Sequence, residues 1–223
     1  MAVNRSVGRS TVSVAEAHLA RVAASGSSRH LHLTALLEAS GLNSSRDLAD
    51  CVHLLCGLHG SPPSLVELAH RNADAGPARD WLARAAEGFE RERLFLVRLT
   101  SAVGPIPSTP GAAETEATMN AQRNALEILA TSERRGCALG AAAALVGDWW
   151  PIRRILDRAA SRAGLDSPAP ALPDESTIVA AIHLASDTPA SERALGFGSE
   201  QLLLQHRGLF DLLEARSEAR QDY

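Results

Sequence analysis

Apolar side chains recur at helical spacing along most of this 223-residue chain, and this pattern restricts the fold more than any other feature. Between the Gly76-Pro77 and Gly104-Pro105 pairs, large apolar residues return every three or four positions, which is typical of one face of a long helix. Nowhere do β-branched or aromatic residues alternate with polar ones over a convincing stretch. The sequence therefore predicts an all-α fold.

Proline, glycine and capping residues divide this pattern into separate helices. We expect three long helices, near residues 77–103, 110–146 and 189–219. The second is either unbroken or bent near Ser132, and a further helix with Asp148 as its cap and Pro151 in its first turn follows it. Shorter helices are predicted near residues 12–24, 30–39, 44–58, 64–72 and 174–185, with Ser44–Asp47 and Ser64–Glu67 as capping boxes.

Long helices joined by short turns predict an antiparallel helical bundle, which could be ferritin-like, with short accessory helices packed around it. The length fits one domain with a sizeable core. We expect residues 1–11 to be a disordered N-terminal arm and 12–223 to be a single helical domain. The Pro-rich stretch 165–173 is the best candidate for a connection within it. Gly136 and Gly140 form a small-xxx-small pair that would let another helix approach closely.

Composition excludes several kinds of chemistry. All 22 basic residues are arginine, so no lysine can form a Schiff base or bind phosphate in a P-loop. The only tyrosine is Tyr223, at the end of the chain, which argues against tyrosine acid–base chemistry. The formal net charge is -4 and arginines are interleaved with acids, so we expect no binding to nucleic acid or to anionic membranes.

The three cysteines, Cys51, Cys56 and Cys137, form no disulfide-rich pattern and suggest a reducing compartment. No apolar run approaches the ~20 residues of a membrane span. We therefore expect a cytoplasmic protein.

The segment His53-x-x-Cys56-x-x-His59, with Asp50 before it, has the composition of a metal site. On a helix, however, these three side chains spread over about 120° and about 9 Å, so at most two of them could share one ion. His59 falls on the apolar face, whereas Asp50 and His53 point largely away. The alternative is structural: Cys56 is a buried small residue, His53 is solvated, and His59 bonds carbonyls at the helix end.

A second group consists of polar residues on core faces. Glu92, Glu133 and His206 each lie between apolar residues at helical spacing and should face inward. Buried carboxylates and histidines are costly unless they are paired. They are either matched by arginines from other helices, or they form a polar pocket together with His59. We expect no cofactor, and if a metal binds, its ligands would be Glu92, Glu133, His59 and His206.

Trp149 and Trp150 stand side by side at a predicted helix start, where both are difficult to bury. Either one packs while the other covers a helix end, or the pair belongs to a surface that binds a partner.

Four segments carry a resemblance to a known group of proteins: CVHLLCGLHG (51–60), GPIPSTPG (104–111), RRGCALG (134–140) and QHRGLFDLLEAR (205–216). Together they resemble a family of uncharacterised helical proteins from alphaproteobacteria, over roughly residues 30–216. This resemblance implies a bacterial, cytoplasmic origin and carries no activity or site residues.

Two hypotheses of function remain. The first is a non-catalytic helical module that binds a protein partner or a small ligand. The second is a ferritin-like carboxylate and histidine metal protein or oxidoreductase. No residue is singled out as catalytic.

Overall fold

The computed structural model describes residues 12–221, and over this range the chain is built of α-helices, one 3-10 turn and no strand. The all-α prediction is therefore confirmed. The expected disordered arm, residues 1–11, lies outside the described residues. The helices, in chain order, are α1 (Val14–Ser25), α2 (Leu31–Glu38), α3 (Leu42–His59), α4 (Leu65–Asn72), α5 (Pro77–Ala102), α6 (Ala112–Ala130), α7 (Cys137–Ala163), α8 (Glu175–Ala185) and α9 (Pro189–Gln221), with the turn η1 (Ser27–Arg29) after α1.

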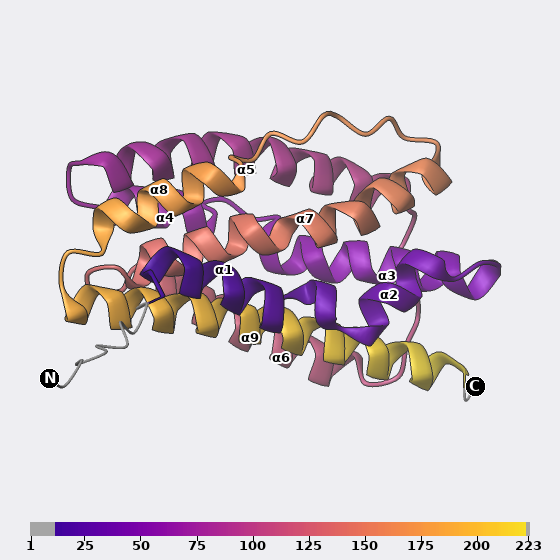
Figure 1. The fold of residues 1–223 in the computed structure, drawn as a ribbon. Coiled ribbons are helices and arrows are strands. Elements are labelled where there is room, and N and C mark those ends of the chain that lie inside the picture. The colour runs from indigo at the N-terminus through magenta and orange to yellow at the C-terminus, as the bar shows by residue number, and fades with distance from the viewer. Residues whose placement is uncertain (1–11, 222–223) are drawn as a thin grey trace, which may run out of the picture.

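Helix α7 is the centre of the molecule, because it contacts every other helix. Its residues from Leu139 to Val146 are all buried. Figure 1 shows α9 running along almost the whole length of the molecule on one side of α7, and α5 on the other. One apolar cluster includes residues from all nine helices of the described range, so the core is continuous.

Small residues bring α7 and α9 together. A Cβ at Gly140 would lie 2.1 Å from the backbone oxygen of Leu195, and one at Gly198 would lie 2.0 Å from that of Cys137. Only glycine allows backbones to pass this closely. The close helix approach predicted from Gly136 and Gly140 is thus present, and its partner is α9.

Several helix boundaries follow their local signals. Pro77 lies in the first turn of α5, Ser64 accepts a hydrogen bond from the Glu67 N–H at the start of α4, and Asp174 accepts one from Thr177 N–H at the start of α8. The Pro-rich connection 165–173 is non-helical, as predicted. The last helix runs without a break past Gly196 and Gly198.

Two predicted boundaries are wrong. The chain leaves the helix after Ala130 and re-enters at Cys137, and α7 then continues through Asp148 and Pro151 to Ala163. Asp148 is therefore no helix cap. Packing of Trp149, Ile152 and Ile155 in the core outweighs the local signal for a new start, because burial stabilises the continuous helix more than one lost backbone bond at proline costs.

The capping box predicted at Ser44 and Asp47 is also wrong. Helix α3 begins earlier, at Leu42. The Ser44 hydroxyl donates to the Ala39 carbonyl, and Asp47 forms an ion pair with Arg220 of α9. Both side chains bond to groups outside α3 and therefore do not cap this helix.

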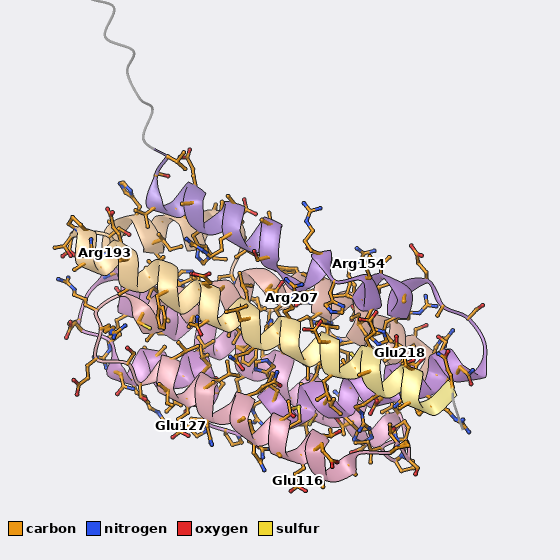
Figure 2. All side chains as sticks on the ribbon, turned by 90° about the horizontal axis from the view of Figure 1, so that it is seen from below. Glu116, Glu127, Arg154, Arg193, Arg207 and Glu218 are labelled. Carbon is orange, nitrogen blue, oxygen red and sulfur yellow. The ribbon has the colours of Figure 1, made fainter. Side chains whose placement is uncertain are left out.

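The outer surface is covered by charges of both signs. Figure 2 labels Glu116 and Glu127 on α6 and Arg193, Arg207 and Glu218 on α9. Within residues 12–221, no helix is both long enough and apolar enough to cross a membrane.

Candidate functional site

Three ionisable side chains from three helices form a hydrogen-bonded chain inside the core. Asp148 lies in the middle of α7, His206 in the middle of α9 and His59 at the end of α3. Asp148 Oδ2 is 2.7 Å from His206 Nδ1, and His206 Nε2 is 3.1 Å from His59 Nε2. All three are buried, with exposed fractions of 1%, 0% and 5%. We call this chain the Asp148–His206–His59 triad.

The turn η1 holds Asp148 from the other side. Ser27 donates its backbone N–H to Oδ1 at 2.7 Å and its hydroxyl to Oδ2 at 2.6 Å. Gly26 makes this contact possible, because a Cβ there would lie 2.5 Å from Asp148 Oδ1. With the bond to His206, the carboxylate takes part in three hydrogen bonds.

We take the Asp148 carboxylate as the acceptor of the triad, and the proton positions follow from that choice. An ionised carboxylate only accepts, so Asp148 takes the Nδ1–H of His206. With its one proton on Nδ1, His206 offers Nε2 as an acceptor, and His59 donates its Nε2–H to it. This assignment leaves a lone pair on the Nδ1 of His59. Burial, and then the neighbouring His206, lower the pKa of His59 well below its usual value, so this ring is neutral.

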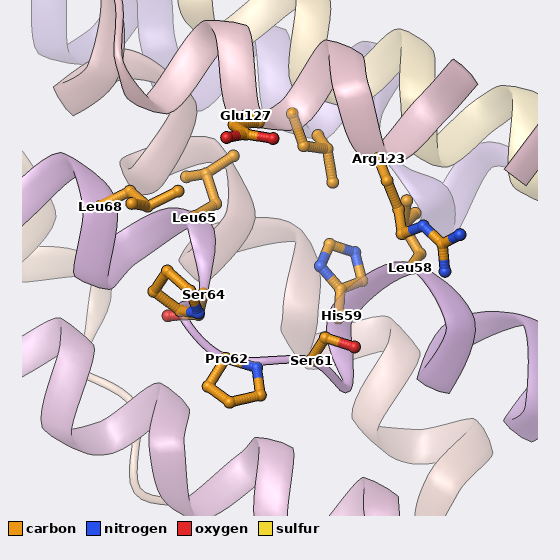
Figure 3. A pocket seen from close by; sticks show the side chains of 11 residues that line it. Leu58, His59, Ser61, Pro62, Ser64, Leu65, Leu68, Arg123 and Glu127 are labelled. Atoms are coloured by element: carbon orange, nitrogen blue, oxygen red, sulfur yellow. The ribbon is translucent and has the colours of Figure 1, made fainter. Parts of the chain in front are cut away.

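The second edge of the His59 ring borders a cavity of about 230 Å³. Within residues 12–221, Nδ1 of His59 has no hydrogen-bond partner. It is also not one of the unpaired polar atoms that are fully buried away from solvent. Figure 3 shows the ring among the residues that line this space, which we call the His59 cavity. Its lining is Leu58, His59, Ser61, Pro62, Pro63, Ser64, Leu65, Leu68, Arg123, Leu126 and Glu127.

Aromatic rings fix the orientation of His59. It meets Trp149 edge-on at 5.5 Å between ring centroids and Phe89 at 6.0 Å. The indole N–H of Trp149 donates to Glu92 Oε2 at 3.1 Å. Such packed and hydrogen-bonded neighbours hold the imidazole in one rotamer.

Glu92 is part of a second buried cluster, next to the triad. Its carboxylate accepts from Arg153 at 2.8 and 2.9 Å and from the backbone N–H of Ala171 at 3.2 Å. Arg153 also bonds Asp157 and the Pro168 carbonyl. The cluster thus ties α5 and α7 to the Pro-rich connection.

The sequence placed Glu92 and His206 in the core, and both are there, but Glu133 is exposed in the turn between α6 and α7. Its inward orientation was predicted for a continuous helix that the structure does not contain. With Glu133 outside and Glu92 held by Arg153, the set Glu92, Glu133, His59 and His206 does not converge on one ion. Only the two histidines of this set touch.

The histidine and cysteine segment of α3 also differs from expectation. Asp50 is fully buried, not turned away, and its carboxylate is 2.7 Å from Arg216 and 2.6 Å from Arg220 of α9. His53 bonds the Gly104 carbonyl at 2.8 Å instead of being solvated. Cys56 is half-buried. Helix α3 has partners on more than one face, whereas the prediction assumed a single buried apolar face.

The two tryptophans separate. Trp149 is 1% exposed and cannot belong to a partner surface in this conformation, whereas Trp150 is 40% exposed.

In the described part of the chain, the ligand atoms of His30, Asp211 and Glu214 lie close enough together to hold a metal ion. The hydrogen bonds argue for a different role. Nδ1 of His30 accepts from the His32 N–H, so Nε2 carries the proton and donates to Asp211 at 3.0 Å. A metal on Nε2 would displace both this proton and the cap of α2. We interpret the group as a hydrogen-bonded link between α2 and α9.

Sequence reasoning missed Asp148 and Ser27 as members of the site. An acid two residues after the long apolar run ending at Val146 was the available signal, and it was interpreted as a cap. Ser27 offers no local signal, because it reaches Asp148 across 121 positions of sequence.

Comparison with known proteins gives one match. Residues 22–221 match the family described as "Family of unknown function (DUF6975)". No curated protein and no solved structure matches the chain. Because the match spans nearly all of the described helices, this chain belongs to the family of unknown function DUF6975.

Proposed function

We propose that this protein binds a small molecule in the His59 cavity. The observation that supports this most directly is the imidazole of His59, which presents a free Nδ1 to an otherwise largely apolar space while its Nε2 is engaged in the core. Binding pockets in general combine apolar walls with a few fixed polar groups that orient the ligand.

The lining defines the ligand class. Leu58, Leu65, Leu68 and Leu126 form apolar walls that suit an aromatic or compact aliphatic body. A cavity of about 150 Å³ holds a benzene ring, so about 230 Å³ accommodates a ring with one or two substituents. Nδ1 of His59 requires a hydroxyl or N–H on that body. Arg123 and Glu127, which are both exposed, can contact a polar end that faces solvent.

The test is a titration of the full chain with phenol and toluene, followed through backbone amide resonances. Phenol should shift the backbone amides of Ser61, Ser64 and Leu65, and toluene should bind about 2–10-fold more weakly because it lacks the hydroxyl. Ser61→Trp should abolish both effects by filling the cavity mouth. Ser101→Trp, at an exposed position of α5 outside the lining, is the matched control and should bind normally.

The proposal is wrong if neither compound shifts these amides, or if Ser61→Trp binds as the wild-type protein does.

We also propose a bacterial, cytoplasmic setting. Cys51, Cys56 and Cys137 are all free thiols, which suits a reducing compartment. Fractionation of an alphaproteobacterium that expresses a tagged copy tests this, and recovery with the periplasm or membranes would contradict it.

A further inference from the structure

We propose that the Asp148–His206–His59 triad is a proton relay that makes Nδ1 of His59 a base toward a molecule in the His59 cavity. This inference rests on the proposed ligand site and adds an activity to it. The substrate class is a weakly acidic C–H or O–H compound with a compact apolar body.

The chemical step balances without any further reactant. The substrate gives its proton to Nδ1 of His59, and the bonding electron pair stays on the substrate. The Nε2 proton of His59 passes to Nε2 of His206 over the 3.1 Å contact. His206 becomes an imidazolium, and the positive charge lies next to the Asp148 carboxylate, 2.7 Å away.

The geometry explains why this arrangement suits a base better than a lone buried histidine. A charge on His59 itself would lie against Phe89 and Trp149 in the core, which is costly. The relay moves the charge to His206, where an ionised carboxylate fixed by two bonds from Ser27 compensates it. This is the role that the aspartate of a serine protease plays for its histidine.

Few other charges face the triad. Arg123 and Glu127 of α6 line the cavity, while Glu92 of α5 is separated from His59 by Trp149 and neutralised by Arg153. The carboxylate of Asp148 is therefore the group that sets the proton positions in the triad.

Asp148→Asn tests the relay through the positions of the protons. The backbone N–H of Ser27 must face an oxygen, so the new amide nitrogen takes the place of Oδ2 and donates to Nδ1 of His206. His206 then carries its proton on Nε2, and His59 must accept there. The proton of His59 moves to Nδ1, so His59 presents an N–H donor to the cavity instead of a lone pair.

Nitrogen-15 NMR of the histidine rings measures this directly. In the wild-type protein His59 should be protonated on Nε2 only, and in Asp148→Asn on Nδ1 only. Glu127→Gln removes a carboxylate at the cavity but not from the triad, and should leave the tautomer unchanged. A wild-type His59 protonated on Nδ1 overturns the proposal, even if Asp148→Asn does not fold.

Reactivity is tested with 5-nitrobenzisoxazole, a compact aromatic probe. A base removes its ring C–H proton, the N–O bond breaks, and a coloured cyanophenolate forms. The wild-type protein should accelerate this opening by at least ~10²-fold over His59→Gln, which keeps a donor toward His206 but is no base. Asp148→Asn should lose at least ~10-fold in rate, because Nδ1 of His59 then carries a proton and is no base.

The outcomes separate the two proposals. If the probe binds, as judged by the amides of Ser61, Ser64 and Leu65, and the wild-type protein is no faster than His59→Gln, the relay is refuted and the ligand site stands. If the probe and phenol both leave these amides unshifted, the ligand site itself is refuted and the relay with it.

Discussion

Arg153→Met should be among the most destabilising single substitutions in this protein. The guanidinium and the Glu92 carboxylate are 3% and 2% exposed and 2.8 Å apart. Removing the arginine leaves the carboxylate buried with only the N–H groups of Trp149 and Ala171 as donors. Loss of one member of a buried ion pair costs about 3–5 kcal/mol. Glu92→Leu should cost a similar amount.

The double variant Glu92→Leu/Arg153→Met removes both charges together. It still leaves the indole N–H of Trp149 and the amide of Ala171 without an acceptor, at about 1–3 kcal/mol each. The free energy of unfolding should therefore fall by about as much as in either single variant. The coupling free energy between the two positions should therefore equal the cost of one single variant, about 3–5 kcal/mol.

Urea denaturation followed by tryptophan fluorescence measures these values. With a slope of about 2–3 kcal/mol per molar urea, each single variant should lower the midpoint by about 1–2.5 M. The pair Glu87 and Arg91, which is exposed on α5, is the matched control and should show coupling of only about 0.3–0.5 kcal/mol. Additive effects at Glu92 and Arg153 would refute the argument.

Three further outcomes follow from the structure. Gly140→Ala should lower stability by about 1–3 kcal/mol because the added methyl meets the α9 backbone, whereas Gly147→Ala, with ordinary contacts, should be neutral or stabilising in thermal melts. Burial lowers the pKa of His18 to about 4, below its unfolded value near 6.5, so the unfolded chain binds more protons in this window. Stability should fall by about 3 kcal/mol from pH 6.5 to 4, and His18→Leu should lack this component in urea titrations at each pH. Burial raises the pKa of the Cys51 thiol, so a disulfide reagent should modify half-buried Cys56 first, as peptide mapping would show.

The sequence by itself determined the helical class and most helix ends. Pro77, Ser64 and Asp174 act within their own first turn, and such local signals need no partner. Helical spacing also placed Glu92 and His206 correctly in the core, because periodicity reports which face a helix buries.

Only the tertiary structure decided which polar residues meet. His59 and His206 are 147 positions apart, and Asp148 is 58 positions from His206, so no local pattern joins them. The local sequence predicted that Asp148 caps a helix and that Asp50 points outward. Both are buried instead, because Ser27 bonds Asp148 and Arg216 bonds Asp50 from distant elements. Burial of a charged group depends on partners that compensate its lost hydration, and the fold supplies those partners. The same packing forms the His59 cavity, whose lining comes from α3, α4, α6 and the connection between α3 and α4.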